Sequence, residues 1–383
     1  MRIAIIGSRG FPYVYSGYET FVTHLAPGLA TRGHEVTVYC HRELFDSRPE
    51  EVDGVRLVYA PGLRSKSLSQ LTHSLTSTLH FLLRRADVAF YVNSANGPFG
   101  PLLRLFGVPC AINVDGMEWL RPKWAGLGGR YFRWASWMAA RSFREIVTDA
   151  EAMGRIYQKE FGRGSTVIRY GATPARSSSP ELLEEFGLAP GEYLLVVGRL
   201  IPDNNADLLV EAFSRTDSRR KLVVVGDVPY EDAYARRVRE VSDNRVVFTG
   251  YVRDQDVLRE LYCNCYAYMH GHEFGGTNPT LLQALATGCC VLALDTPFTR
   301  EVLENEKHGL FFHKNVASAV SALGRIEREE DLVKAKRLTA RDRICEAYTW
   351  DSIVDAYETL FSQMVTPEHV HRRPSGNDRR NDT

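Results

Sequence analysis

Short runs rich in β-branched residues alternate with helix-length segments through both halves of the chain. Such alternation is the sequence form of repeated βα units around a parallel sheet. Two of the runs, residues 3–7 (IAIIG) and 193–198 (YLLVVG), each open a series and end in glycine. Because 383 residues are too many for one ordinary core, we expect an α/β protein with two domains, each built around its own sheet.

The alternation also indicates where the domains divide. Residues 171–181 are polar and contain proline, as linkers do, and the pattern turns wholly helical after Asn315. We expect an N-terminal domain (1–175), a C-terminal domain (176–349), a separate helix (350–364) and a disordered tail (365–383). Strands are predicted at 2–7, 35–40, 55–60, 88–92, 110–115, 145–148, 166–170, 193–197, 221–225, 245–249, 266–270, 290–294 and 309–312.

The composition excludes several classes of protein. Charged residues make up 25% of the chain, and no apolar run approaches the ~20 residues that a membrane span needs. The N-terminus lacks the features of a secretory signal, and the seven cysteines form no CxxC pair. We therefore expect a cytoplasmic protein whose cysteines are reduced and buried. The chain also lacks the basic helix or stripe of a nucleic-acid-binding protein.

Two glycine-bearing strand ends are candidate binding segments, because doubly wound sheets bind ligands beyond the C-terminal ends of their strands. Residues 7–20 follow the first strand but lack the GxGxxG spacing of NAD-binding proteins. Gly17 can bring the backbone close to a diphosphate there, or the loop can simply turn the chain. In the second series, Arg199 follows Gly198 at a strand end, where a guanidinium can pair with phosphate oxygens.

The most specific segment is MHGHEFGGTNPTLLQALATGCC, residues 269–290. Its glycines form a flexible turn, and Asn278 with the following proline marks a helix N-terminus that favours phosphate. Glu273, near that positive end, is an acceptor suited to sugar hydroxyls, although it can also serve only to compensate the helix dipole. The residues expected to contact a phosphorylated ligand here are Gly275, Gly276, Thr277 and Asn278.

Two histidines and two aspartates raise the question of a metal ion. His270 and His272 are two residues apart at a strand end, but the sequence nearby offers no evident third ligand. Asp254 and Asp256 form a DxD string that opens a predicted helix, for which capping is the better explanation. We predict neither a metal nor a cofactor.

Four segments in order resemble the retaining family-4 glycosyltransferases of the GT-B fold. They are residues 1–26, 113–124 (NVDGMEWLRPKW), 196–213 and 270–288, and they are most similar to the rhamnosyltransferase-type branch that makes bacterial surface polysaccharides. The resemblance implies two Rossmann-like domains facing across a cleft. It also implies that a nucleotide-sugar donor binds in the cleft, mainly to the second domain, and that a last helix crosses back to the first.

The resemblance implies that Glu273 contacts the donor sugar and that Arg199 contacts the diphosphate. It also implies that Gly17 lies near the phosphates. Three positions depart from the family: Ser16 replaces a usual glycine, Asn204 a phosphate-binding lysine, and Gln283 the second glutamate of an E-x7-E motif whose spacing here is two residues longer. That glutamate normally accepts hydrogen bonds from ribose hydroxyls, and glutamine is a weaker acceptor. We therefore hypothesise a deoxyribose donor, dTDP-rhamnose.

The resemblance further implies front-face attack, in which the leaving phosphate deprotonates the acceptor hydroxyl and the protein contributes positioning and electrostatics. Asp115, at a strand end of the first domain, can hold the acceptor or an oxocarbenium-like centre, or it is a turn aspartate. We expect transfer of a sugar to a glycan or lipid-linked acceptor in surface polysaccharide synthesis. The alternatives are a non-catalytic nucleotide-sugar sensor and a nucleotide-sugar epimerase on the same fold.

Residues 118–144 suggest a contact with the inner face of the membrane. Four tryptophans stand there among six basic residues, and residues 1–175 carry 21 basic against 14 acidic residues, compared with 26 against 33 in the remainder. Tryptophan with arginine is typical of an interfacial surface, although packing in the domain core explains these side chains as well. The tryptophans are Trp119, Trp124, Trp134 and Trp137.

Overall fold

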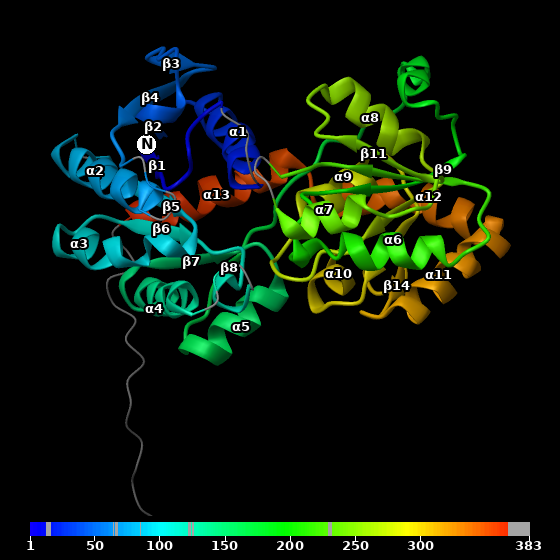
Figure 1. Cartoon of the computed structure of the whole chain (residues 1–383). Helices are drawn as coiled ribbons and strands as arrows, with labels where there is room; N and C mark the ends of the chain where they lie inside the picture. Colours follow the sequence, from blue (N-terminus) through cyan, green and yellow to red (C-terminus); the bar gives the residue numbers. More distant parts are fainter. Residues whose placement is uncertain are drawn as a thin grey trace, which may run out of the picture.

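The computed structural model describes residues 1–12, 17–63, 65, 68–84, 86–121, 124, 126–228 and 232–366. The chain forms two lobes side by side, each with a sheet that carries helices on both faces (Figure 1). The first lobe takes its strands from residues 2–167 and the second from residues 193–312. The prediction of two α/β sheets is therefore confirmed.

The sheet of the first lobe has eight strands in the order β3-β4-β2-β1-β5-β6-β7-β8, and every neighbouring pair is parallel except β3 with β4. Its strands are β1 (Arg2–Ile6), β2 (Glu35–His41), β3 (Glu51–Val52), β4 (Val55–Ala60), β5 (Val88–Val92), β6 (Cys110–Asn113), β7 (Glu145–Thr148) and β8 (Thr166–Val167). Its helices are α1 (Gly17–Ala30), α2 (Ser69–Arg84), α3 (Gly100–Leu105), α4 (Leu127–Ser142) and α5 (Glu151–Phe161).

The sheet of the second lobe has six parallel strands in the order β11-β10-β9-β12-β13-β14. Its strands are β9 (Tyr193–Val197), β10 (Lys221–Val225), β11 (Val246–Gly250), β12 (Ala267–His270), β13 (Val291–Leu294) and β14 (Leu310–Phe312). The α-helices described from residue 193 to residue 366 are α6 (Ala206–Ser214), α7 (Ala233–Arg239), α8 (Gln255–Asn264), α9 (Pro279–Ala286), α10 (Pro297–Val302), α11 (Val316–Arg328), α12 (Glu330–Ala347) and α13 (Trp350–Val365).

Both sheets reverse their strand order at one point, which fixes where a ligand can bind. In the first lobe the order reverses between β1 and β5, and in the second between β9 and β12. The strands at these points are apolar along nearly their whole length because helices cover both faces of the sheet, and all five residues of β5 are buried. Doubly wound sheets bind ligands beyond the C-terminal ends of the strands at this reversal.

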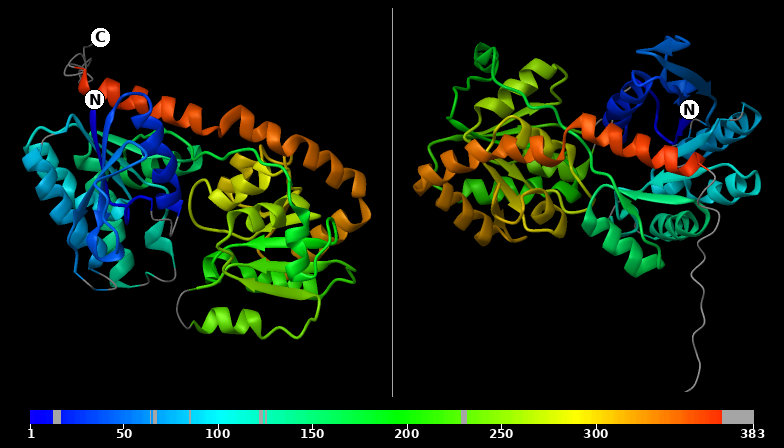
Figure 2. Two further views of the ribbon diagram at one scale, coloured as in Figure 1. Left: turned by 90° about the horizontal axis from the view of Figure 1, so that it is seen from above. Right: turned by 180° about the vertical axis from the view of Figure 1, so that it is seen from behind.

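Helix α13 returns to the first lobe. Figure 2 shows α12 and α13, in orange and red, running along one side of both lobes. In the first lobe, Tyr357 of α13 packs against Phe21 and Phe90, with ring centroids 5.4 and 5.1 Å apart, and its hydroxyl accepts a hydrogen bond from Asn113. The last helix therefore completes the core of a domain that begins at the N-terminus.

The segment expected to be a linker is anchored to the second lobe. The side chain of Glu260 in α8 is fully buried and accepts hydrogen bonds from Ser177 Oγ and from the backbone N–H groups of Ser178 and Ser179, at 2.5, 2.8 and 3.1 Å. These bonds hold the pKa of Glu260 below its ordinary value despite the opposing effect of burial. The chain therefore leaves the first lobe on a path that a buried carboxylate fixes.

Some local expectations are confirmed and others are wrong. The Asp254 side chain accepts from the backbone N–H groups of Asp256 and Val257, so capping explains the DxD string. The sequence does not predict the hairpin strand β3, because two residues are too few to show the alternation of apolar and polar residues that marks a strand. Six of the seven cysteines are buried, but Cys345 on α12 is exposed. Of the tail, residues 367–383 lie outside the described part of the chain.

Candidate active site

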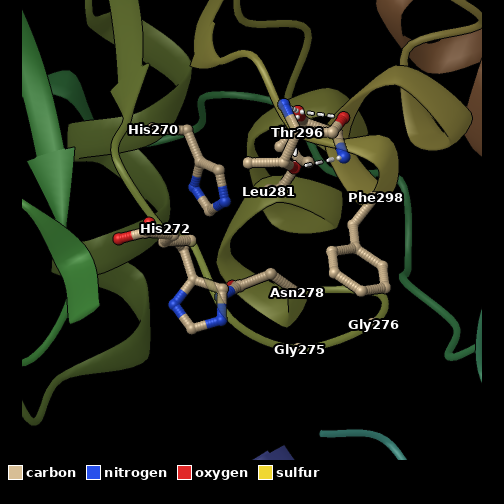
Figure 3. Close-up of a pocket in the computed structure, with 10 residues that line it drawn as sticks. His270, His272, Gly275, Gly276, Asn278, Leu281, Thr296 and Phe298 are labelled. Atoms are coloured by element: carbon tan, nitrogen blue, oxygen red, sulfur yellow. Dashed lines mark hydrogen bonds between the residues drawn. The ribbon is translucent and has the colours of Figure 1, made fainter. Parts of the chain in front are cut away.

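A pocket lies at the C-terminal ends of β12 and β13, on the side of the second lobe that meets the first. Its wall includes the predicted residues Glu273, Gly275, Gly276 and Asn278. Figure 3 shows the rings of His270 and His272 on one side of the pocket and the ring of Phe298 on the other. The remaining lining residues are Leu281, Thr296 and Thr299.

Glu273 lines this pocket and forms an ion pair with a residue outside it. Its backbone N–H donates to the carbonyl of Asp203, at 3.0 Å, and its Oε2 lies 2.5 Å from Nζ of Lys314. Lys314 follows β14 and stands 41 residues further along the chain. The carboxylate that the sequence predicts to meet a sugar is therefore held by an ion pair that the sequence does not reveal.

Arg199 follows the end of β9, as the strand pattern predicts, and Asn204 lies at the end of the short 3-10 helix that comes next (Pro202–Asn204). The Asn204 side chain donates to the carbonyl of Arg199 at 2.8 Å and bonds to Nδ1 of His272 at 2.8 Å. Arg199 itself is exposed, and its guanidinium has no hydrogen-bond or ion-pair partner among the residues described. Burial and the charges of Arg121 and Arg199 hold the pKa of His272 well below its ordinary value. A neutral histidine of the pocket therefore lies near a guanidinium that has no partner among the described residues.

The N-termini of two helices, one from each lobe, meet at the pocket. Asn278 caps α9 by accepting from the N–H of Thr280 at 2.9 Å, as predicted. Gly17 opens α1, and a Cβ there would lie 3.4 Å from Cγ of Pro279. Gln283 stands on α9 with a half-buried side chain that makes no hydrogen bond to any described residue. Ser16 lies outside the residues that the structure describes.

Two aspartates of the first lobe accept hydrogen bonds from the glycine turn of the second lobe. The N–H of Gly276 donates to the carbonyl of Asp115 at 2.7 Å, and the N–H and hydroxyl of Thr277 donate to Asp149, at 2.7 and 2.6 Å. A Cβ at Gly276 would overlap the carboxyl group of Asp149. The backbone donors that we predict for a phosphorylated ligand are therefore bound to oxygens of the opposite lobe in this structure.

Asp115 is a half-buried, hydrogen-bonded carboxyl group rather than a simple turn residue. Tyr18 donates a hydrogen bond to its Oδ1, and Tyr170 donates to its Oδ2 at 2.8 Å. Burial raises the pKa of Asp115 from 3.8 to about 6, against the effect of the two phenol hydrogen bonds. Burial and the charge of Asp115 also raise the pKa of Asp149 well above its ordinary value. The two carboxyl groups therefore share a site in which ionisation is costly.

Further charged groups join the lobes around the pocket. Nη2 of Arg121 donates to the carbonyl of Phe274 at 3.3 Å, and its Nε lies 3.3 Å from Oδ2 of Asp203. Glu301 of α10 accepts from the first N–H groups of α5, those of Glu151 and Ala152, at 2.8 and 3.0 Å. A carboxylate at a helix N-terminus is favourable. These contacts hold the lobes together on the pocket side.

The two histidines of the pocket suit a neutral role. Burial lowers the pKa of His270 to about 3, and its Nδ1 lies 3.1 Å from the hydroxyl of Tyr268. The rings of His270 and His272 are 6.1 Å apart and tilted by 53°. Within the described ranges, the side chains close enough to share a metal ion are Glu304, His308 and Glu346, none of which lines this pocket.

Sequence reasoning misses Asp149, Arg121, Glu301 and Lys314. For Asp149 a signal exists: it follows a predicted strand, as Asp115 does, and the ends of parallel strands meet at one edge of the sheet. Arg121 lies within a segment whose basic residues we interpret as a membrane surface. Glu301 and Lys314 carry no local signal, because each acts on a residue far away in the chain.

Comparison with known proteins places this site in a family context. Residues 191–328 match the family described as glycosyl transferases group 1, and residues 16–171 match the glycosyl transferase 4-like domain. The two matches coincide with the two lobes. Between them they include Gly17, Asp115, Arg199, Glu273 and Gln283.

Two curated relatives span nearly the whole chain. The O-antigen chain mannosyltransferase C of Escherichia coli is 22% identical, over 95% of this chain and 99% of that protein. A GDP-mannose-dependent alpha-mannosyltransferase of Mycobacterium tuberculosis is 26% identical, over 88% of this chain and 91% of its own.

A third relative matches over a shorter stretch. It is the N-acetylgalactosamine-N,N'-diacetylbacillosaminyl-diphospho-undecaprenol 4-alpha-N-acetylgalactosaminyltransferase of Campylobacter jejuni. It is 26% identical over 50% of this chain, and the match covers about half, 52%, of that enzyme.

Solved structures share the fold at low sequence identity. A sucrose-phosphate synthase from Thermosynechococcus elongatus superposes with a TM-score of 0.81 at 16% identity, over 95% of this chain and 98% of its own. HepE of Anabaena in complex with UDP gives 0.76 at 16% identity, over 95% and 100%. WaaG, a glycosyltransferase involved in lipopolysaccharide biosynthesis, gives 0.72 at 16% identity, over 94% and 100%. The two-lobed GT-B architecture is therefore shown.

Proposed function

The chain belongs to the group 1 glycosyltransferases and has the GT-B fold, and from this premise we propose a retaining enzyme of surface glycan synthesis. It transfers a sugar from a nucleoside diphosphate donor to a glycan or lipid-linked acceptor. The proposal assigns the acceptor to residues 1–175 and the donor to residues 176–349, with residues 350–364 as the helix that returns to the first domain. Because both matched families are glycosyltransferases, we favour sugar transfer over the alternatives of a nucleotide-sugar sensor and a nucleotide-sugar epimerase.

The observation that carries the proposal is the pocket where the lobes meet. The proposed donor site extends from this pocket to Arg199, whose exposed guanidinium has no partner among the described residues and can pair with phosphate oxygens, and the N-terminus of α9 lines the same pocket. Glu273 lines the pocket with a carboxylate that can accept hydrogen bonds from sugar hydroxyls. The site thus offers Arg199 and the N-terminus of α9 to a diphosphate, and Glu273 to a sugar.

The roles in transfer follow from this arrangement. Arg199 and the N-terminus of α9 stabilise the charge that develops on the leaving diphosphate, and Glu273 orients the sugar. Gly17, Gly198, Gly275 and Gly276 let the backbone approach the donor. Each N–H group can make only one good hydrogen bond. The N–H groups of Gly276 and Thr277 must therefore release their acceptors in the first lobe before they can donate to the donor.

We assign the donor as dTDP-rhamnose on the basis of Gln283. Its amide has no partner among the described side chains and can contact the sugar of the nucleoside. Glutamine is a weaker acceptor than glutamate, and a deoxyribose has one hydroxyl group fewer to be accepted than a ribose. The relatives whose names specify a sugar transfer mannose or N-acetylgalactosamine, and HepE binds UDP. A panel of dTDP-rhamnose, GDP-mannose and UDP-N-acetylgalactosamine therefore tests the assignment. Faster turnover of either of the last two would refute it.

The decisive test of the site is Glu273→Gln. This variant keeps the size of the side chain and removes its charge, so we expect the transfer rate to fall by roughly tenfold to a hundredfold, as for loss of a charged hydrogen bond. Glu211→Gln is the matched control, because Glu211 forms an exposed ion pair with Arg215. Full activity of Glu273→Gln with a correctly folded protein would remove Glu273 from the mechanism.

We also propose that the first lobe contacts an anionic membrane, through a surface wider than residues 118–144. Trp119 and Trp124 pack inward, against Phe161 and Phe132, whereas Trp134 and Trp137 are 47% and 40% exposed. Other exposed large apolar side chains lie on or beside α2, α3 and α4: Leu75, Leu79, Leu83, Leu105, Phe106 and Leu127. In Figure 1, α2 and α3 lie on the side of the first lobe that faces away from the second.

Cations accompany these apolar side chains. A groove of about 420 Å³ between α3 and α4 is lined by Arg104, Trp137 and Arg141, and the guanidinium of Arg141 lies 4.8 Å from the centre of the Trp137 ring. No helix in the described part of the chain is long and apolar enough to cross a bilayer, so the proposed contact is peripheral.

Vesicles of phosphatidylglycerol test this contact by sedimentation. We expect Trp134→Ala/Trp137→Ala to bind less than the parent protein, and Leu338→Ala, which removes an exposed apolar side chain at a 78% exposed site of the second lobe, to bind as the parent does. Absence of binding by the parent protein would refute the membrane contact and leave the proposed transfer reaction untouched.

A further inference from the structure

We propose that Lys314 is a positioning residue of the donor site, which holds the Glu273 carboxylate in place at the wall of the pocket and keeps it from pairing with Arg199. The inference rests on the proposed function of Glu273 and adds a residue that no motif of the chain contains. Its basis is the contact between Nζ of Lys314 and Oε2 of Glu273, at 2.5 Å.

The contact leaves one oxygen of Glu273 available. Lys314 occupies Oε2, whereas Oε1 makes no hydrogen bond to any residue that the structure describes. The Glu273 side chain is 24% exposed and lines the pocket, and the Lys314 side chain is 52% exposed. One carboxylate oxygen is thus bound to the protein from the solvent side, and the other remains free for a hydroxyl group of a sugar.

The backbone on both sides of Lys314 is fixed. The residue stands between β14 and α11, and Asn315 caps α11 by accepting from the N–H of Ser318 at 2.8 Å. The Ser318 hydroxyl in turn accepts from the N–H of His313 at 2.9 Å. A lysine that follows a strand and precedes a capped helix has little backbone freedom, so its ammonium group stays within reach of Glu273.

The pair has a clear consequence for Arg199. Arg199 lacks a partner among the described residues and lies near enough to His272 to lower the pKa of that side chain, and Glu273 is the next residue. A carboxylate without its own cation would compete with a diphosphate for this guanidinium. Lys314 neutralises Glu273, so Arg199 remains free for the anionic ligand.

Stability does not explain the pair. A partly exposed lysine and glutamate that lie far apart in the chain gain little from pairing, because water screens the charges and both long side chains lose rotamer freedom. The chain contains a matched example, in which Lys307 lies 2.8 Å from Glu304 with a 56% exposed side chain. Lys307→Met is therefore the control for Lys314→Met, because it removes the same group from a pair that does not line the pocket.

The experiment compares ligands with and without the sugar. Binding of dTDP-rhamnose and dTDP, and of GDP-mannose and GDP, is measured by calorimetry for the parent protein, Lys314→Met, Lys314→Arg and Lys307→Met. For the sugar nucleotide that the parent binds more tightly, we expect Lys314→Met to weaken binding about tenfold, the loss of one oriented charged hydrogen bond. We expect binding of the free diphosphate to change less than threefold, Lys314→Arg to restore most of the loss, and Lys307→Met to behave as the parent.

Glu273→Gln separates this inference from the proposed function. If Lys314 acts through Glu273, then adding Lys314→Met to Glu273→Gln causes no further loss of sugar-nucleotide binding. Normal binding by Lys314→Met, or an additional loss in the double variant, would overturn the inference while Glu273→Gln still tests the donor site by itself. If Glu273→Gln binds as the parent does, the proposed role of Glu273 fails. Melting temperatures within a few degrees of the parent establish that each variant is folded.

Discussion

Gly276 offers the sharpest test of how the two lobes meet. A Cβ at this position would come closer than 3.0 Å to three atoms of the Asp149 carboxyl group. Gly276 has none of the positive φ angles found at other glycines, so alanine adds a steric change without backbone strain. Gly276→Ala must therefore displace Asp149 or separate the turn from the first lobe.

The size of the effect follows from the bonds that are lost. The turn gives three hydrogen bonds to the first lobe: Gly276 N–H to Asp115, and the N–H and hydroxyl of Thr277 to Asp149. At about 1 kcal/mol each, their loss removes roughly 3 kcal/mol from the closed arrangement. This corresponds to roughly a hundredfold shift toward open lobes, since about 1.4 kcal/mol is a factor of ten in an equilibrium constant.

Small-angle X-ray scattering and steady-state kinetics measure the two consequences. We expect Gly276→Ala to have a larger radius of gyration than the parent protein and a kcat/KM at least tenfold lower. Gly164→Ala is the control, because the nearest atom to its Cβ would be Oε1 of Gln158, at an ordinary 3.6 Å. In an Asp149→Ala background, the alanine at 276 has room, so its effect should largely vanish. An unchanged radius and rate in Gly276→Ala, or equal effects in both backgrounds, would contradict a steric conflict between residue 276 and Asp149.

Three further predictions concern charged groups around the pocket. Because folding raises the pKa of Asp115 from 3.8 to about 6, its contribution to the free energy of unfolding is greatest below pH 4 and is lost as the pH rises through 6. The melting temperature of Asp115→Asn should therefore fall less than that of the parent between pH 4.5 and 7.5, and parallel curves would contradict this. Arg199→Ala should raise the KM for the donor roughly tenfold or more, measured at low salt, whereas Arg215→Ala, at an exposed surface pair, should leave it unchanged. Glu301→Gln should lower the free energy of unfolding in urea by about 1 kcal/mol, because the N-terminus of α5 and Arg169, 3.5 Å away, lose a negative charge.

Much of the fold can be predicted from the sequence because parallel strands buried on both faces form continuous apolar runs. The strand at 88–92 is an example: both of its ends agree with the structure, since every residue is buried. The strand predicted at 166–170 is too long. Ile168 and Tyr170 are buried and apolar as a strand would require, but β8 ends at Val167 and their burial comes from packing outside the sheet ladder.

The site is predictable in part, for a physical reason. Arg199, Glu273 and Asn278 can be predicted as candidates because each lies near a strand end or a helix N-terminus, which local patterns mark. Their partners are not found by such patterns. Lys314 reaches Glu273 across 41 residues and Thr277 reaches Asp149 across 128, and pairs this far apart leave no periodic trace in a single sequence.

Helix α13 also has a consequence for how the chain is made. The buried side of this helix, which includes Tyr357 and Phe361, packs on Phe90 in the middle of the first sheet. A ribosome that has released residues 1–175 has therefore supplied every strand of the first lobe but not the last part of its core. The apolar surface around Phe90 stays uncovered until α13 has been synthesised, so the first lobe cannot complete its core before the strands of the second lobe have been made. A nascent chain of this kind needs protection over its first half for as long as its second half is being made.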